Sequence, residues 1–475
     1  MAMKARLAII GAGTAGLTAL KEARRHTDDV VLINDGPYGT TCARVGCMPS
    51  KALLAAAHAF QYREFLHEAG VRGTASLTAD IPAVLSRVRR LRDRFVRGPT
   101  ELARSLGERS ISGRPRFLDA NTLAVDDVRI EAEATVIATG TRPIVPAPWR
   151  ALGRRLLTSD SVFEQDNLGR HVAVIGLGGI GCELGQALGQ LGLTVHGFTR
   201  DSVVAGVSDP AVNEKFIESL RRSMTVTTNA DVALEPTGKS RVRVRANGEI
   251  TEVDWVLAAV GRTPNLEGLG LEDLGSAVDA GGLPAVDPMS LRIGDLPIYV
   301  AGDVNGIRPL MHEAADEGRI AAYHALHPRA ECLARRTGLA IAFTEPNVAR
   351  VGTGFDELQG DTFVVGDADF SSQPRALMMG RNEGCLRVYA SIPEGRLLGA
   401  EMCVPEGEHL AHLLAWALQR QLTVDDMLQL PFYHPVVEEG LRAAVQRARR
   451  ALGTRRSTPD LPLCEEAADW ALGAG

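Results

Sequence analysis

The chain has 475 residues, of which 45% are apolar and 23% are charged, a balance typical of a globular protein with about three domains. With 52 Lys and Arg residues against 58 Asp and Glu residues, the net charge is −6, which argues against nucleic acid or an anionic membrane as a partner. No apolar run approaches the ~18 residues of a membrane-spanning helix. Seven cysteines without the spacing of a disulfide scaffold indicate a reducing compartment. Since the N-terminal residues lead straight into a strand with no targeting segment, we expect a cytoplasmic enzyme.

The first residues form a strand–turn–helix–strand pattern with glycines in the turn. An apolar run at 7–10 leads into GAGTAG, which contains Gly11, Gly13 and Gly16; a helical stretch to about residue 25 and a second apolar run at 30–33 follow. Glycines at this spacing permit a sharp bend and let a pyrophosphate approach the backbone N–H groups of a helix N-terminus. The pattern predicts a dinucleotide site.

The same pattern recurs further along the chain. An apolar run at 172–175 precedes GLGGIG, which contains Gly176, Gly178 and Gly181, and a helix to about residue 191 and a run at 195–198 follow. Two complete motifs imply two dinucleotide sites, for instance for a flavin and a nicotinamide. Further strand-like runs ending in glycine occur at 135–138, 253–259 and 298–301.

From about residue 340 the pattern is that of an α+β domain. We expect strands at 347–352, 362–366, 385–391 and 397–403, a hairpin turn at 392–395, and helices at about 408–420 and 436–452. Because no nucleotide motif occurs here, a substrate or subunit-interface role is expected. The polar tail contains Cys464 with no second cysteine beside it, and we expect the tail to be passive.

Two cysteines stand at the start of an early helical run. The sequence GTTCARVGCMPSK places Cys42 and Cys47 about one helical turn apart, and Gly46 permits the distortion that would let them bridge. The helix dipole favours a thiolate at a helix N-terminus, which suits thiol–disulfide exchange. The alternative is two half-buried cysteines with no bond, which the nearby nucleotide motif disfavours. Arg44, between them, faces either a substrate carboxylate or solvent.

Near the other end, FYHPVVEEGL places His434 directly before Pro435. Pro435 suits the first position of a helix and favours an extended conformation for His434. One turn later, Glu438 or Glu439 could hold one ring nitrogen and leave the other free as a base near neutral pH. A lone histidine at a helix start is more often a polar surface residue than a catalytic one. The presence of the cysteine motif in the same chain favours a catalytic base at His434.

Together these motifs resemble those of the flavin-dependent pyridine nucleotide–disulfide oxidoreductases, the family of dihydrolipoamide dehydrogenase, glutathione reductase and mercuric reductase. The resemblance extends to about residue 452 and is greatest to dihydrolipoamide dehydrogenase. It is carried by GTTCARVGCMPSK, by CELG after the second glycine motif, by AGD at 301–303, by FTEP at 343–346 and by FYHPVVEEGL.

The resemblance implies an α/β fold with two Rossmann-like dinucleotide-binding domains, for FAD and NAD(P), and a C-terminal α+β dimerisation domain. The implied divisions are 1–147 for the first part of the FAD domain with the redox disulfide, 148–268 for the NAD(P) domain, 269–339 for the second, central part of the FAD domain, 340–452 for dimerisation and 453–475 for the tail. A homodimer with an active site shared between its subunits is also implied.

The resemblance further implies which residues bind the cofactors. FAD would be held by Gly11, Gly13, Gly16, Lys51, Gly113, Thr139, Gly140 and Asp303. NAD(P) would be held by Gly176, Gly178, Gly181, Thr199, Arg200 and Gly261. No metal site is implied.

Catalytic roles follow from the same resemblance. Cys42 would be the interchange thiol that attacks the substrate disulfide, and Cys47 would be the charge-transfer thiolate beside the flavin. Lys51 would approach the flavin and pair with Glu183. His434 would be the acid/base, oriented by Glu439, with Glu438 the less favoured partner.

The nucleotide motifs depart from the family pattern at two positions. Where the family usually has a glutamate for the flavin ribose, this chain has Asn34 followed by Asp35, and Asp35 is the better acceptor. In the second domain, Thr199 and Arg200 stand where a carboxylate would favour NAD. Arg200 could take the 2′-phosphate of NADP, or it could be solvated while Thr199 bonds a ribose hydroxyl of NAD.

We therefore expect an FAD-dependent dihydrolipoyl dehydrogenase that moves two electrons between dihydrolipoyl groups, free or on a lipoylated protein, and NAD(P). The alternative within the enzymes is an NADPH-dependent reductase of a low-molecular-weight disulfide such as glutathione or mycothione. A flavin-dependent transhydrogenase or quinone reductase would not need both cysteines. A different class of function, a lipoyl-domain docking subunit with slow chemistry, is distinguished by comparing turnover on free and protein-bound substrate.

Overall fold

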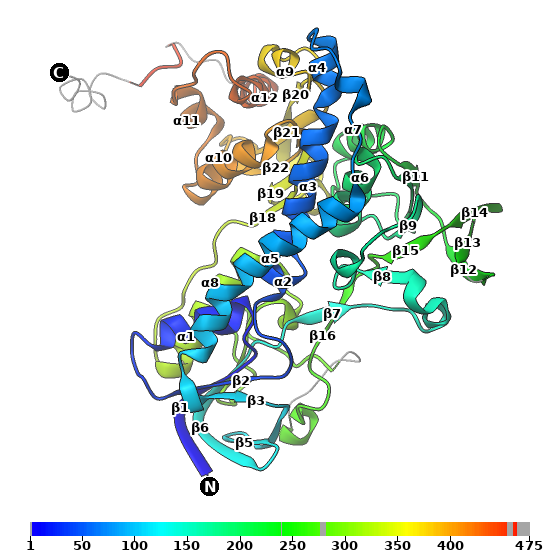
Figure 1. Ribbon diagram of the computed structural model, residues 1–475. Helices are drawn as coiled ribbons and strands as arrows, with labels where there is room; N and C mark the ends of the chain where they lie inside the picture. Colours follow the sequence, from blue (N-terminus) through cyan, green and yellow to red (C-terminus); the bar gives the residue numbers. More distant parts are fainter. Residues whose placement is uncertain (1, 239, 276–281, 454–458, 463–475) are drawn as a thin grey trace.

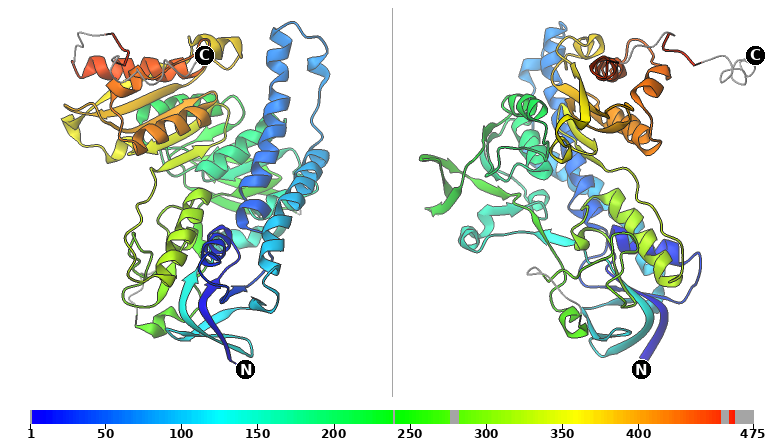
Figure 2. Two further views of the ribbon diagram at one scale, coloured as in Figure 1. Left: turned by 90° about the vertical axis from the view of Figure 1, so that its left-hand side faces the viewer. Right: turned by 180° about the vertical axis from the view of Figure 1, so that it is seen from behind.

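The computed structural model describes residues 2–238, 240–275, 282–453 and 459–462, so Cys464 and most of the predicted tail lie outside the described residues. Three large sheets with packed helices make up the molecule (Figure 1). The first sheet and the C-terminal sheet lie at opposite ends, and the second sheet lies to one side between them (Figures 1 and 2). Among the described helices, none is long and apolar enough to cross a membrane.

The first sheet has seven strands in the order β3-β2-β1-β6-β5-β4, with β17 also paired to β6. Its strands are β1 (Ala2–Ile10), β2 (Val30–Asn34), β3 (Ser110–Ser112), β4 (Pro115–Asp119), β5 (Thr122–Val125), β6 (Val128–Ile137) and β17 (Ile298–Val300). The associated helices are α1 (Thr14–Ala23), α2 (Thr41–Arg44), α3 (Cys47–Gln61), α4 (Arg63–Glu68), α5 (Ile81–Arg104) and α8 (Met311–Leu326). Because β17 pairs with β6, the chain returns to this sheet after building the second one.

Small residues bring the helices of this domain close together. Helix α1 packs on α8, and a Cβ added at Gly318 of α8 would overlap the backbone carbonyl of Ala15 in α1. Strand β2 is buried along its whole length, as its apolar VVLI sequence predicts.

The second sheet has five parallel strands in the order β11-β10-β9-β15-β8. These are β8 (Leu156–Thr158), β9 (His171–Ile175), β10 (Thr194–Phe198), β11 (Thr225–Thr227) and β15 (Trp255–Ala258), with helices α6 (Gly179–Gln190) and α7 (Pro210–Leu220). A separate antiparallel sheet contains β12 (Val232–Thr237), β13 (Arg241–Ala246) and β14 (Glu249–Val253), and the pair β7 (Thr141–Pro143) and β16 (Arg262–Pro264) connects the first two domains.

The strand expected at 253–259 is divided in the structure. Strand β14 ends at Val253 and β15 begins at Trp255, and the two belong to different sheets. The residue between them, Asp254, accepts backbone N–H groups of Arg170 and His171 at 2.8 and 2.9 Å, which holds the chain at the point where it changes sheets.

The C-terminal domain is an antiparallel sheet in the order β18-β19-β22-β21-β20. Its elements are β18 (Leu339–Ala342), β19 (Asn347–Gly352), β20 (Phe363–Asp369), α9 (Pro374–Met378), β21 (Cys385–Ser391), β22 (Leu397–Val404), α10 (Gly407–Gln419), α11 (Val424–Gln429) and α12 (Glu438–Ala451). The expected turn is present, with Gly395 at φ +66°. The sequence analysis did not predict β18, α9 or α11.

Short 3-10 helices complete the described part of the chain: η1 (Thr74–Ser76), η2 (Gly107–Arg109), η3 (Ala147–Arg155), η4 (Val162–Glu164), η5 (Leu271–Leu274), η6 (Asp303–Asn305), η7 (Phe355–Glu357) and η8 (Gly360–Thr362).

A buried polar network joins the second domain to the C-terminal domain. Glu401, on β22, accepts the backbone N–H of Asp209 at 2.8 Å and the hydroxyl of Ser208. The Asp209 carboxylate accepts hydrogen bonds from Arg387 at 2.7 Å and from the Tyr389 hydroxyl at 2.9 Å. Both carboxylates are fully buried, so their charges are compensated inside the protein.

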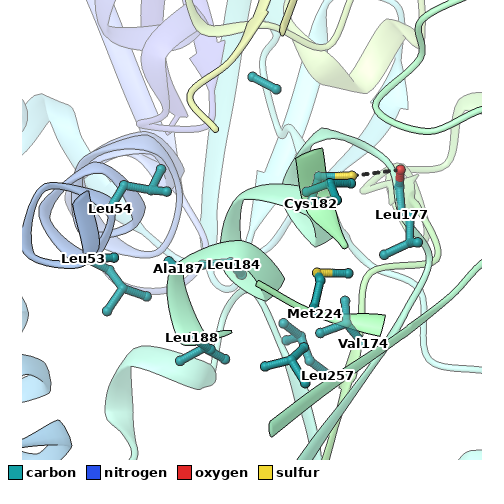
Figure 3. Close-up of a cluster of buried hydrophobic side chains, with 14 of the residues drawn as sticks. Leu53, Leu54, Val174, Leu177, Cys182, Leu184, Ala187, Leu188, Met224 and Leu257 are labelled. Atoms are coloured by element: carbon teal, nitrogen blue, oxygen red, sulfur yellow. Dashed lines mark hydrogen bonds between the residues drawn. The ribbon is translucent and has the colours of Figure 1, made fainter. Parts of the chain in front are cut away.

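An apolar cluster fixes α3 against α6, and thereby the first domain against the second (Figure 3). Leu53 and Leu54 of α3 and Leu184 and Leu188 of α6 are almost completely buried in it. Lys51 lies one turn before Leu54 on α3, and Glu183 directly precedes Leu184 on α6. The cluster therefore holds these two charged side chains close to each other.

Candidate active site

The cysteine motif folds as two helical pieces joined at a glycine. Cys42 lies in α2, and Cys47 is the first residue of α3. Thr40 begins α2 by accepting the Ala43 N–H at 3.1 Å. Both cysteines are half-buried free thiols, and their sulfur atoms lie within hydrogen-bonding distance of each other. The fold thus brings together the two thiols that the sequence analysis paired.

The two thiols differ strongly in acidity. The hydrogen bond to Cys47, together with burial, raises the pKa of Cys42. The same hydrogen bond lowers the pKa of Cys47 to about 7, and the Lys51 ammonium acts in the same direction against the effect of burial. The position of Cys47 at the N-terminus of α3 also favours negative charge. In the dithiol form Cys47 is therefore the more acidic thiol and loses its proton before Cys42 does.

Lys51 is part of a set of contacts that connects the first domain, the second domain and the C-terminal domain. Its ammonium lies 2.8 Å from each carboxylate oxygen of the buried Glu183. Glu183 also accepts the backbone N–H of Phe343 at 2.8 Å, and the ammonium lies 4.7 Å from the centre of the Phe343 ring. The sequence analysis quoted FTEP as a motif but assigned Phe343 no role. The motif could be seen in the sequence, but the contact of Phe343 with Lys51 and Glu183 could not.

His434 and Glu439 form a hydrogen-bonded pair. The imidazole Nδ1 lies 3.0 Å from one carboxylate oxygen of Glu439, and the other oxygen accepts the Val436 N–H at 3.2 Å. The hydrogen bond with His434 lowers the pKa of Glu439, so this carboxylate is charged at neutral pH. The expected helix start was wrong: α12 begins at Glu438, and Pro435 precedes it in a cis peptide bond with His434.

The His434 pair lies far from the cysteines within one chain. The α11–α12 segment and α2 are well separated in Figure 1, and the imidazole is 74% exposed. His434 therefore does not complete a site with Cys42 inside a single subunit. An exposed imidazole with a fixed partner at Nδ1 leaves Nε2 available to a group outside this chain.

The two glycine loops have the same construction. Gly11 and Gly176 have φ of +107° and +94°, and a Cβ at either position would overlap the carbonyl oxygen of the neighbouring strand end, Ala138 and Ala259 respectively. A Cβ at Gly16 would overlap the Gly11 carbonyl oxygen, and Gly181 stands in the same relation to Gly176. No Cβ contact restricts Gly178, and only a 3.8 Å contact is made at Gly13, so these two positions leave room for a ligand. Both loops fit a bound pyrophosphate.

The remaining residues expected around FAD surround the first loop. The Asn34 amide accepts the Ala12 N–H at 2.9 Å and donates to the Gly36 carbonyl at 2.9 Å, so it shapes the loop, while Asp35 is exposed. The Gly113 N–H donates to the Asn34 carbonyl at 3.1 Å.

Two polar groups suited to the flavin follow strands of the same sheet. The Thr139 hydroxyl, next to Gly140, is buried and makes no hydrogen bond to any described residue. Burial raises the pKa of Asp303, and the Arg262 guanidinium opposes this effect. An unpartnered hydroxyl and a strongly desolvated carboxylate fit a site for a polar ligand.

In the second domain the residues expected near NAD(P) follow β10 and β15. Thr199 is buried, and its hydroxyl accepts the Asp201 N–H at 3.3 Å, so it is already engaged within the chain. Arg200 is exposed and pairs with no carboxylate of the described chain. Gly261, at the end of the neighbouring strand, accepts the Ile144 N–H at 3.0 Å. Arg200 is thus the side chain free to meet a ligand.

Arg44, which lies between the two cysteines in the sequence, is half-buried, with its Nε shielded from solvent and unpaired in the part of the chain that the structure describes. The described residues contain no cluster of three or more His, Cys, Asp or Glu side chains that could hold a metal ion.

Comparison with known proteins gives matches along almost the whole chain. The family model of pyridine nucleotide-disulphide oxidoreductases matches residues 5–318, and that of their dimerisation domain matches 339–445. A dihydrolipoyl dehydrogenase of Haloferax volcanii is 32% identical over 94% of this chain and 96% of its own. A dihydrolipoyl dehydrogenase of Geobacillus stearothermophilus is 28% identical over 95% and 97%. A mercuric reductase of Staphylococcus aureus is 29% identical over 92% and 81%.

Solved structures agree with this assignment. LpdA from Mycobacterium tuberculosis has a TM-score of 0.80 and 27% identity, covering 93% of this chain and 99% of its own. The flavoprotein disulfide reductase RclA from Escherichia coli has a TM-score of 0.81 with the same coverage; at 23% identity it supports the fold alone. The predicted fold class is confirmed. The chain belongs to the pyridine nucleotide-disulphide oxidoreductases, flavoprotein enzymes of the disulfide oxidoreductase class that use FAD and NAD(P)H and, as the dimerisation domain indicates, form homodimers.

Proposed function

We propose that this enzyme is a dihydrolipoyl dehydrogenase, which oxidises dihydrolipoyl groups and delivers two electrons to NAD(P). The observation that carries the proposal is that the fold brings Cys42 and Cys47 together next to the Lys51–Glu183 ion pair. The relatives named dihydrolipoyl dehydrogenase support the substrate class.

In the proposed exchange, Cys42 and Cys47 start as a disulfide. A substrate thiolate attacks the Cys42 sulfur, forming a mixed disulfide, breaking the Cys42–Cys47 bond and leaving Cys47 as the thiolate. The second thiol of the substrate then attacks the substrate sulfur that is bonded to Cys42. This bond breaks, its electron pair goes to Cys42, and Cys42 takes up a proton. The substrate leaves as a cyclic disulfide, and the protein has gained two electrons.

His434 is the proposed base for this exchange. Its Nε2 would take the proton from the attacking substrate thiol and return it to Cys42, while Glu439 holds Nδ1 and stabilises the imidazolium. Since His434 lies far from Cys42 in one chain, we propose that it serves the thiols of the partner subunit, so that the dimer has two equivalent shared sites.

The geometry of the two glycine loops supports a proposal for the cofactor sites. FAD would be held at Gly11, Gly13 and Gly16, with Asp35 as the ribose acceptor and with Gly113, Thr139, Gly140 and Asp303 around it. NAD(P) would be held at Gly176, Gly178 and Gly181, with Thr199, Arg200 and Gly261 nearby. When bound, FAD accepts the two electrons of the dithiol and passes them to the nicotinamide. Lys51, fixed by Glu183, supplies positive charge beside Cys47.

Rapid-mixing reduction of the oxidised holoenzyme tests the proposed substrate. Dihydrolipoamide should reduce the enzyme faster than glutathione, and NAD(P) should then reoxidise it. The second candidate is an NADPH-dependent reductase of a small disulfide, which the exposed Arg200 favours. Rapid reduction by NADPH together with no reaction with dihydrolipoamide would select that candidate.

Subunit mixing tests the shared site. Cys42→Ser and His434→Ala homodimers should each be inactive, whereas refolding them together should restore activity, because a mixed dimer contains one site with neither lesion. Differently tagged subunits confirm that mixed dimers have formed. If mixed dimers form and remain inactive, each site is built from one chain.

A further inference from the structure

The exposed face of α5 carries a row of arginines. Arg87, Arg90, Arg94 and Arg97 are spaced by three, four and three residues, which places them on one side of the helix, and all four are exposed. We refer to these four residues as the α5 arginine stripe. The whole chain has a net charge of −6, so this concentration of positive charge runs against its overall composition. Glu101, one turn beyond Arg97, ends the stripe.

The stripe has no acidic partners. None of its four guanidiniums forms an ion pair with a carboxylate among the described residues. Arg87 donates to the backbone carbonyl of Ala52 at 3.5 Å, and Arg90 donates to the hydroxyl of Ser86 at 2.9 Å. Their full positive charge therefore faces the surroundings of the protein.

The arginines next to the stripe behave differently. Arg92 pairs with Asp93 at 2.9 Å and with Glu164, and Arg89 lies 3.5 Å from Asp166 and donates to two backbone carbonyls. These two arginines attach α5 to the loop before β9. Arg89 and Arg92 thus have a structural role in holding α5 in place. The four arginines of the stripe have no such ion pairs in the described part of the chain.

The stripe lies close to the redox motif. Helix α2, which contains Cys42, packs against α5, and an added Cβ at Gly39 would lie 2.5 Å from a methyl group of Val96. At 100° per residue, Val96 faces roughly away from the stripe, so the redox motif and the stripe lie on different sides of the same helix. Figure 2 shows α5 at the edge of the molecule in its left view, with no described segment over its outer side.

We propose that the α5 arginine stripe docks an acidic protein domain that carries the dithiol substrate. The proposal rests on the proposed function and specifies its substrate as protein-borne. Ten residues of helix place the first and last guanidiniums about 15 Å apart, a span suited to a protein surface and longer than a small disulfide. An acidic patch on a protein domain, of about the same span, complements the four arginines.

The test measures kcat/KM of the holoenzyme with three substrates: a reduced lipoyl domain of net negative charge, dihydrolipoamide, which is neutral, and dihydrolipoate, which is a small anion. The variant Arg90→Glu/Arg94→Glu/Arg97→Glu reverses the stripe and spares Arg87, which contacts Ala52. A matched control, Arg72→Glu/Arg150→Glu/Arg154→Glu, makes the same change in net charge at exposed arginines elsewhere. Bound flavin and dimer mass show that both variants are folded.

At low salt the reversed stripe should lower kcat/KM for the domain about tenfold or more, and the deficit should shrink as salt is added. Dihydrolipoamide should be used as well as by the unmodified enzyme, and lysines in place of the three arginines should retain most of the rate with the domain. An equal loss in the control variant would refute the proposal, since net charge alone would explain it. An equal loss with dihydrolipoate would refute a protein partner. No turnover of any of the three by the unmodified enzyme would refute the proposed function, and the docking role with it.

Discussion

The hydrogen bond between the two site cysteines can be tested directly. It is the largest influence that lowers the pKa of Cys47 from 9.0 to about 7. A hydrogen bond to a charged group contributes about 1.5–3 kcal/mol, and one pKa unit corresponds to about 1.36 kcal/mol. Replacing Cys42 by alanine, which cannot donate, should therefore raise the pKa of Cys47 by about one to two units. Cys42→Ser keeps a hydroxyl donor and should keep most of the lowered pKa.

The assay is the rate of iodoacetamide alkylation as a function of pH, read at each cysteine by mass spectrometry on the anaerobic dithiol holoenzyme. Only the thiolate reacts, so the inflection for Cys47 reports its pKa. Exposed Cys332 serves as an internal reference, and buried Cys403 should remain unmodified. If alanine and serine at position 42 shift the Cys47 inflection equally, or if neither shifts it, the hydrogen bond is not the cause of the low pKa.

Three further predictions concern coenzyme choice and stability. Arg200→Glu should move the preference toward NADH by about 1–3 kcal/mol, because a carboxylate repels a 2′-phosphate; the ratio of kcat/KM for the two coenzymes measures it. Asp209→Ala leaves Arg387 and Tyr389 without their acceptor and should cost about 3 kcal/mol in the free energy of unfolding, measured with denaturant. Burial raises the pKa of Glu345 from 4.5 to about 7, so between these pH values the folded state binds more protons than the unfolded state. The free energy of unfolding should therefore fall by about 3 kcal/mol as pH rises from 4.5 to 7. Glu345→Gln should abolish that fall.

The first two of these predictions have matched controls. Arg200→Lys keeps the charge and should leave the coenzyme ratio close to that of the unmodified enzyme. Asp367→Ala removes an exposed partner of Arg447 and should change stability by less than about 1 kcal/mol. The coenzyme prediction is contradicted if Arg200→Glu leaves the selectivity unchanged. The second prediction is contradicted if Asp209→Ala and Asp367→Ala lower the free energy of unfolding equally, and the third if Glu345→Gln leaves the pH profile of stability unchanged.

The conformation of the two glycine loops could be predicted from sequence because their requirement is local and steric. At Gly16 and Gly181 a side chain would overlap a backbone carbonyl five residues earlier, so the spacing of the glycines contains the information. The unequal acidity of Cys42 and Cys47 could be assigned only by resemblance, because it depends on a contact between thiols and on the position of Lys51 in three dimensions.

Other features were missed, one because it depends on a long-range contact and two because local signals were overlooked or misread. Asn34 stands where the family usually has its ribose acceptor, with Asp35 preferred for that role, and its amide accepts the Ala12 N–H, a contact that the sequence does not mark. Helix α11 has only six residues, and its Thr423 capping box with Asp426 is a signal that the sequence analysis overlooked. The α12 boundary was placed too early because Pro435 was read as the first helical residue.

The set of contacts at Glu183 has a consequence for engineering. The carboxylate belongs to α6 of the second domain, yet it accepts hydrogen bonds from Lys51 in the first domain and from the Phe343 backbone in the last. The neighbouring Gln186 exchanges two hydrogen bonds with the backbone of Glu345, at 2.7 and 2.8 Å. A chimaera that borrows the second domain from a relative to change coenzyme preference must therefore keep both side chains. Without them the graft would leave Lys51 beside Cys47 with no counter-ion, and the borrowed domain would lose these polar contacts to the first and last domains.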